Sequence, residues 1–129
     1  MSDRKAFQYT ILRVVPDIER GERLNVGVLV YSPELRYLGA RTYVDAERLH
    51  AIAPQVDAGE LERHLDALVA VANGASDGGP LAALSQSERF GALSAPASTT
   101  VQPSEVHTGM CGNGEQALDE LFARLVRTG

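Results

Sequence analysis

The most β-forming segment of this chain reads Gly21-Glu22-Arg23-Leu24-Asn25-Val26-Gly27-Val28-Leu29-Val30-Tyr31. Side chains alternate between the two faces of a strand, so the branched apolar residues at the even positions 24–30 are expected on one buried face. The other face carries Asn25 and Gly27, which strands disfavour. Two interpretations fit: a β-bulge in which Asn25 satisfies a turn backbone, or a strand entrance shaped for a polar ligand by Arg23, Asn25 and Gly27. The bulge is favoured, because bulges commonly serve geometry alone.

The same reading extends to the rest of the chain. Strands are expected at residues 7–15, 24–31 and 36–44, the last two forming a hairpin, with pieces of a further strand at 99–101 and 105–108. Helices are expected at 45–53 and 57–73, with a short one after Ser85 and a last one through Arg127. Early strands followed by helices predict an α+β two-layer sandwich. Its mainly antiparallel sheet would have one face covered by the helices that contain Asp57 and Gln116.

Helix starts carry the clearest local signals. Asp45 and Asp57 are good residues to begin a helix, and Asn113 can cap the last one. Ser85 and Glu88 have the spacing of a capping box. The sequence therefore predicts where four helices begin.

Length and composition fit a single domain over residues 1–129, with a loose leader at 1–5 and a flexible loop at 74–80. The sequence has no apolar run long enough to span a bilayer and no pattern of a secretory signal. A single cysteine, Cys111, excludes an internal disulfide and fits a reducing cytoplasm. One lysine against eleven arginines suggests a bacterial source.

Charge is unevenly distributed along the chain. The formal net charge is −5, with +2 over residues 1–41 and −7 over residues 42–129. The acidic balance argues against a general nucleic-acid-binding protein. Nucleic-acid binding through a local face of N-terminal arginines stays open as a weaker alternative; its members would be Arg13, Arg20, Arg23, Arg36 and Arg41.

Three segments together resemble a known family: the first strand with Phe7-Gln8-Tyr9, the run 20–27, and residues 98–109 with Val101-Gln102-Pro103-Ser104 and Val106-His107-Thr108-Gly109. The chain resembles the uncharacterised bacterial family called domain of unknown function 3037, from Phe7 to about Val126. The family pattern leads us to expect a proline at the start of the last helix, where this chain has Gly114. The resemblance implies no established activity, cofactor or site. It implies a HipA-type kinase as a partner.

An anion site is the most specific site hypothesis. Three glycines before the last helix (Gly109, Gly112 and Gly114) can present backbone N–H groups to a phosphate or carboxylate. Arg23 would supply the counter-charge. A flexible glycine-rich connection is the favoured alternative, because the lysine and spacing of known phosphate loops are absent. The candidate ligand-binding residues are Arg23, Asn25, Gln102, His107, Thr108 and Gly109.

Catalytic and metal-binding patterns are weaker. His107 lies four residues before Cys111 and would be close enough to activate its thiol, but a lone cysteine is more often a small buried hydrophobe. His50, His64, His107 and Cys111 match no zinc spacing. No catalytic residue, metal or cofactor is predicted.

The favoured function is a non-enzymatic interaction or regulatory module of the bacterial cytoplasm, with a protein partner and without a membrane. It rests on the absence of a catalytic pattern, on the small size and on an interrupted sheet with an open edge expected near Pro103. The alternative is a small ligand-binding domain or enzyme that acts on a nucleotide or phosphate-bearing ligand around Arg23, His107 and the glycine loop.

Overall fold

The computed structural model describes residues 3–16, 19–96 and 100–127. In chain order its helices and strands are β1 (Lys5–Val14), β2 (Leu24–Ser32), β3 (Tyr37–Thr42), α1 (Ala46–Ile52), α2 (Ala58–Ala72), the 3₁₀ helices η1 (Ser76–Gly78) and η2 (Pro80–Ala83), α3 (Gln86–Ser94), β4 (Val101–Pro103), β5 (His107–Cys111) and α4 (Gly114–Leu125).

All strand pairs of the described sheet are antiparallel. The strands lie in the order β3-β2-β1-β4, and β5 also pairs with β1. β5 lies beside the first half of β1 and β4 beside its last residues, so both occupy the same edge of β1. The α+β class and the antiparallel sheet predicted from the sequence are confirmed.

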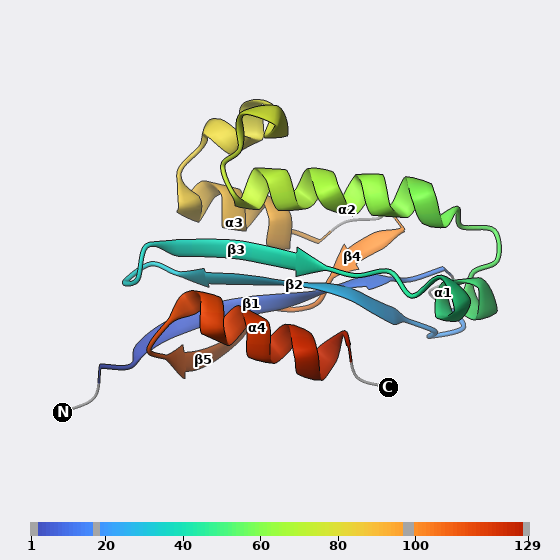
Figure 1. Ribbon diagram of the computed structural model, residues 1–129, viewed down its shortest axis with the longest axis horizontal. Coiled ribbons are helices and arrows are strands. Elements are labelled where there is room, and N and C mark those ends of the chain that lie inside the picture. The colour runs from blue at the N-terminus through green and yellow to red at the C-terminus, as the bar shows by residue number, and fades with distance from the viewer. Residues whose placement is uncertain (1–2, 17–18, 97–99, 128–129) are drawn as a thin grey trace.

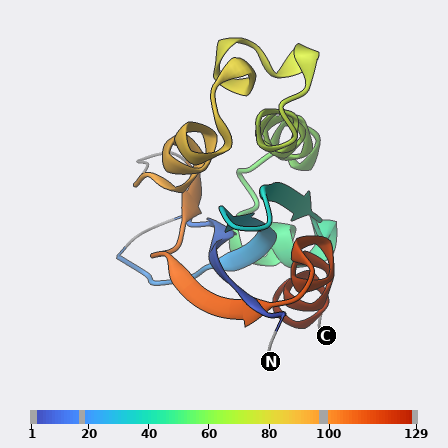
Figure 2. The same cartoon turned by 90° about the vertical axis from the view of Figure 1, so that its left-hand side faces the viewer.

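The helices cover both faces of the sheet (Figures 1 and 2). On one face, Leu118 and Leu121 of α4 pack with Val28 and Val30 of β2. On the other face, Ala72 of α2 and Phe90 of α3 pack with Leu29 and Leu38. The expected placement of the Asp57 and Gln116 helices on one face is therefore wrong. The alternation 28-29-30 explains it, because both faces of β2 are apolar there and each needs a cover.

A register shift interrupts β2 at its start. Leu12 pairs with Gly27 but Arg13 pairs with Asn25, which leaves Val26 without a partner on β1. Such an extra residue is a β-bulge, and the bulge favoured from the sequence is confirmed. The expectation that Asn25 satisfies a turn backbone is wrong, because its amide donates to the carbonyl of Leu125 at the end of α4. The bulge also changes which face Val26 serves. Val26 packs with α1 and α2, whereas Val28 packs with α4, so the expected single face of even positions is split.

All four predicted helix starts are capped as expected. The side chain of Asp45 accepts from the backbone N–H of Glu47 and Arg48, and that of Asp57 from Glu60. Ser85 and Glu88 form a reciprocal capping box. Asn113 accepts from the N–H of Gln116. These contacts satisfy N–H groups that have no partner within the helix.

Ser104 divides the edge strand into β4 and β5. Its backbone N–H donates to the carbonyl of Ile11 (2.8 Å), and its Oγ accepts from the N–H of Ile11 (2.9 Å). Thr10, which is fully buried, donates from Oγ1 to the carbonyl of Ser104 (2.7 Å). β5 then continues to Cys111, so residues 109–111 belong to a strand and not to the expected glycine-rich turn.

The segment 74–80, expected as a flexible loop, contains η1 and the start of η2. The expected leader at 1–5 ends where β1 begins, at Lys5; residues 1 and 2 lie outside the described part of the chain. No helix in the described ranges combines the length and the apolar character needed to cross a membrane.

Candidate functional site

β1 shows how the predicted site residues are distributed. Gln102 and Asn25 flank Arg13 on its two sides. His107 lies beside Tyr9, Thr108 beside Gln8 and Gly109 beside Phe7. Tyr9 and Arg13 are four strand residues apart, which is about 13 Å. The six predicted residues therefore form two groups, with Arg23, Asn25 and Gln102 at one end and His107, Thr108 and Gly109 at the other.

Arg13 is the centre of the first group. Residues directly opposite one another in an antiparallel pair point to the same face, so Asn25, Arg13 and Gln102 share the face that α4 covers. The Nε of Arg13 is buried and has no hydrogen-bond partner among the described residues. Burial, and after it the nearby positive charge of Arg23, lowers the pKa of Arg13, while Glu105 acts in the opposite direction. The guanidinium of Arg23 thus lies close to the partly desolvated guanidinium of Arg13.

Asn25 has a structural contact. Its Nδ2 donates to the carbonyl of Leu125 at the end of α4 (3.0 Å). The last carbonyls of a helix lack partners within the helix, so this amide stabilises the end of α4. The polar residue that interrupts β2 therefore joins two elements 100 residues apart in the sequence.

The second group does not converge on one face. The ring of His107 stacks on that of Tyr9, with centroids 5.2 Å apart. Thr108 pairs with Gln8 and so points to the opposite face. Gly109 lies against the ring of Phe7, which a Cβ at this position would meet at 2.7 Å.

In the glycine loop (residues 109–114), Gly114 leaves room for the side chain of Tyr37 to pack. A Cβ on Gly114 would lie 2.5 Å from the ring of Tyr37, and a Cβ on Gly39 would lie 2.3 Å from its hydroxyl. The ring of Tyr37 is therefore seated between two glycines. The hollow beside the loop, about 360 Å³, is lined by Arg4 and Arg124 and not by Arg23. The structure does not bring Arg23 to the glycine loop, although the anion-site hypothesis requires it.

A hollow of about 450 Å³ lies where the start of β2, α1 and the end of α4 meet. We call it the arginine hollow, and it is lined by Arg23, Leu24, Asn25, Arg48, Ala51, Ile52, Leu125 and Val126. None of these lining residues is acidic. Sequence reasoning found Arg23 and Asn25 but missed Arg48, because nothing local tells on which side of the sheet a seven-residue helix will lie.

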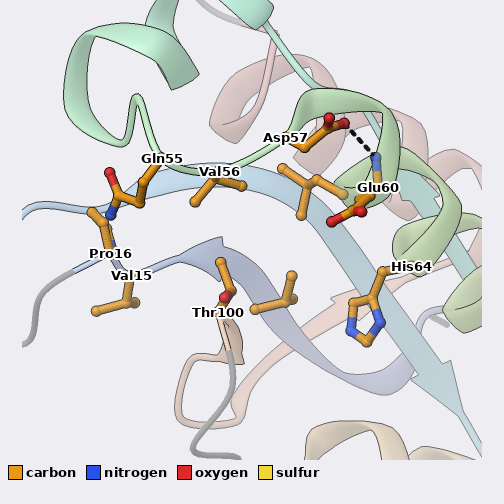
Figure 3. Close-up of a pocket in the computed structure, with 10 residues that line it drawn as sticks. Val15, Pro16, Gln55, Val56, Asp57, Glu60, His64 and Thr100 are labelled. Carbon is orange, nitrogen blue, oxygen red and sulfur yellow. Dashed lines mark hydrogen bonds between the residues drawn. The ribbon is translucent and has the colours of Figure 1, made fainter.

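Another hollow of about 450 Å³ lies between α2 and the end of β1 (Figure 3). Val15, Val56, Leu61 and Val101 give it apolar walls. Glu60 and His64 extend into it from α2, and Asp57 caps that helix by accepting from the N–H of Glu60 (3.0 Å). No predicted site residue lines this hollow. Within the described ranges, no group of three or more His, Cys, Asp or Glu side chains is placed to hold a metal ion.

Cys111 is buried in the cluster that joins α4 to the sheet. It packs there with Phe7, Leu118 and Leu121. This placement is that of a small hydrophobic residue.

β5 forms an outer edge of the described sheet, since β1 is its one strand partner there. Ala6 turns its carbonyl away from β5, toward the hydroxyl of Ser32 (2.9 Å). Backbone groups alternate in direction along an antiparallel pair, so the N–H and C=O of Thr108 and Met110 point outward. Met110 is 52% exposed and Val106 42%. The side chain of Arg4 donates to the outward carbonyl of Met110 (2.7 Å).

Comparison with known proteins identifies the family of the chain. A search of curated proteins found none that matches the chain, and a search of solved structures likewise found none. The model of the family described as "Protein of unknown function (DUF3037)" matches residues 9–126. That span includes β2 with its bulge, the Ser104 break and all of α4, and the resemblance seen in the sequence is confirmed. The chain belongs to the DUF3037 family.

Proposed function

We propose that this protein is a non-enzymatic interaction module that binds an extended segment of a partner protein along β5. The partner segment would add a strand to the sheet, a common mode of peptide recognition. In this proposal the protein acts as one domain in the bacterial cytoplasm and regulates its partner. A HipA-type kinase, which the family resemblance suggests, is the first partner to test.

The open backbone of β5 is the observation that carries the proposal. The N–H and C=O of Thr108 and the N–H of Met110 are directed away from β1 and available to an added strand. Natural edge strands are commonly protected by lysine, proline or a covering element. β5 reads His-Thr-Gly-Met-Cys and contains neither lysine nor proline.

The side chains around this edge support the same function. Met110 and Val106 are exposed apolar residues at the two ends of the edge, about four residues apart. Exposed apolar groups that flank open backbone groups favour a protein partner over water. The stacked pair of Tyr9 and His107 lies on the other face of the same edge and adds aromatic surface, which is common in protein interfaces.

Thr108→Pro is the variant that tests this edge. The N–H of Thr108 points outward, so proline there removes a donor needed by an added strand while leaving the β1 ladder intact. Thr108→Ala is the matched control, because it changes the side chain and keeps the N–H. Each purified form would be mixed with a HipA-type kinase from the same genome, and the affinity measured by calorimetry.

The expected result is that the parent protein and Thr108→Ala bind with similar affinity, while Thr108→Pro binds at least tenfold more weakly. Equal binding by all three forms would exclude β5 as the docking edge. Absence of binding to the kinase by the parent protein would exclude that partner. A dimer of the protein alone, seen by light scattering and lost in Thr108→Pro, would show that the edge pairs two copies of this chain.

A further inference from the structure

The arginine hollow combines two features that ligand sites share. Its volume of about 450 Å³ lies in the range of small-molecule sites. One part of its lining is cationic, with Arg23 and Arg48 from different elements. The rest is mainly apolar, with Leu24, Ile52 and Val126 among the lining residues.

The lining of the hollow carries two positive charges and no negative one, although the chain as a whole carries −5. Glu22, the acidic neighbour of Arg23, is paired with Arg20 at 2.6 Å. Arg13 is the cross-strand partner of Asn25 and adds a third guanidinium near the hollow. Burial, and after it the charge of Arg23, lowers the pKa of Arg13, while Glu105 acts in the opposite direction. An anion placed between Arg13 and Arg23 would reduce the repulsion between them.

The end of α4 opposes an anion here, because the C-terminus of a helix carries partial negative charge. The carboxylate of Glu105, which acts on the pKa of Arg13, opposes it as well. Asn25 reduces the effect of the helix end, since its Nδ2 already occupies the carbonyl of Leu125. The effect of a helix end is also smaller than that of full charges at similar distance. The full charges in the lining of the hollow are those of Arg23 and Arg48.

We infer that the arginine hollow binds a small organic anion, whose carboxylate or phosphate group lies between Arg23 and Arg48 and whose apolar part packs on Leu24, Ile52 and Val126. Guanidinium groups suit this task because they bind both kinds of oxyanion through paired N–H donors. The inference does not depend on β5, which lies along the other edge of β1 from β2.

Four probes test it: acetate, octanoate, inorganic phosphate and octyl phosphate, each titrated into the isotopically labelled full chain and followed by NMR. Octanoate and octyl phosphate should shift the amide signals of Ala51, Ile52 and Val126. Each should bind at least tenfold more tightly than its short counterpart, because the hollow also offers apolar surface. A difference between the two long probes would identify which oxyanion the site prefers.

Arg23→Ala and Arg48→Ala should each weaken binding of the better long probe at least tenfold. Arg63→Ala removes the same charge from the exposed surface of α2 and should leave it unchanged. Circular dichroism would verify that all variants are folded. The inference would be overturned if Arg63→Ala lost binding equally, if the signals shifted elsewhere, or if acetate bound as tightly as octanoate. It would also be overturned if no probe caused a shift at 10 mM, roughly the top of the useful range for weak ligands.

Discussion

Replacing Ser104 by alanine should destabilise the protein measurably, because its hydroxyl fixes the backbone at the point where β4 and β5 separate. The Oγ of Ser104 accepts from the N–H of Ile11 (2.9 Å) and donates to the carbonyl of Glu105 (2.9 Å). Alanine leaves the N–H of Ile11 without that acceptor. A buried donor left unpaired costs about 1–3 kcal/mol, and Ile11 is half-buried, so about 1–2 kcal/mol is expected. The backbone bond from the N–H of Ser104 to the carbonyl of Ile11 remains, as does the bond from Thr10 to the carbonyl of Ser104.

Urea unfolding and thermal melting measure this loss. For a domain of this size, about 1–2 kcal/mol corresponds to a fall in Tm of roughly 4–8 °C. Ser94→Ala is the matched control, since the hydroxyl of Ser94 only adds a second bond to the carbonyl of Phe90 within α3 (2.7 Å). That change should stay within about 0.5 kcal/mol. If Ser104→Ala is no less stable than Ser94→Ala, then the hydroxyl of Ser104 does not stabilise the backbone between β4 and β5, and the reasoning is refuted.

Two further predictions concern the packing and the ionisation of Tyr37. Gly114→Ala places a Cβ 2.5 Å from the ring of Tyr37 and should lower the free energy of unfolding by about 1–3 kcal/mol, measured with urea. The control Gly91→Ala has open space around it in α3 and should raise that free energy by about 0.5–1 kcal/mol. Equal effects of the two changes would contradict the packing role of Gly114. Burial, and after it the carboxylate of Glu115, raises the pKa of Tyr37 above its usual value near 10. A group whose pKa is raised by folding contributes stability that is complete below its unfolded-state pKa. That stability is lost as the pH rises through its folded-state pKa. Above pH 10, about the unfolded-state pKa of tyrosine, the free energy of unfolding should therefore fall more steeply in the parent protein than in Tyr37→Phe. Parallel curves for the two proteins would show that Tyr37 is not held in its neutral form by the fold.

The local features of this fold were predictable because they depend on neighbouring residues. Asp45, Asp57, Ser85 and Asn113 begin helices as expected, because each cap contacts an N–H two or three residues further along. The bulge near Asn25 was also predictable, since asparagine and glycine in a strand mark a local irregularity.

The features missed depend on contacts between distant segments. The face on which α4 lies is set by Val28 and Val30 against Leu118, about 90 residues apart, and no local pattern specifies which apolar face receives which helix. The partner of Asn25 is the carbonyl of Leu125, which a sequence pattern cannot identify. For the same reason Arg48 was not connected with Arg23, because the arginine hollow exists only where β2, α1 and α4 meet.

The position of β4 and β5 beside β1 affects the order in which the chain is assembled during synthesis. Thr10 and Ser104, which bond across this edge, are 94 residues apart, whereas β2 and β3 follow β1 directly and can pair with it early. Contacts between distant residues form late, because closing a long loop costs more entropy. A growing chain that has not yet reached Val101 therefore exposes one side of β1 with its partner missing. In that interval the uncovered side of β1 can pair wrongly with another strand, and a chaperone that covers it would protect the nascent protein.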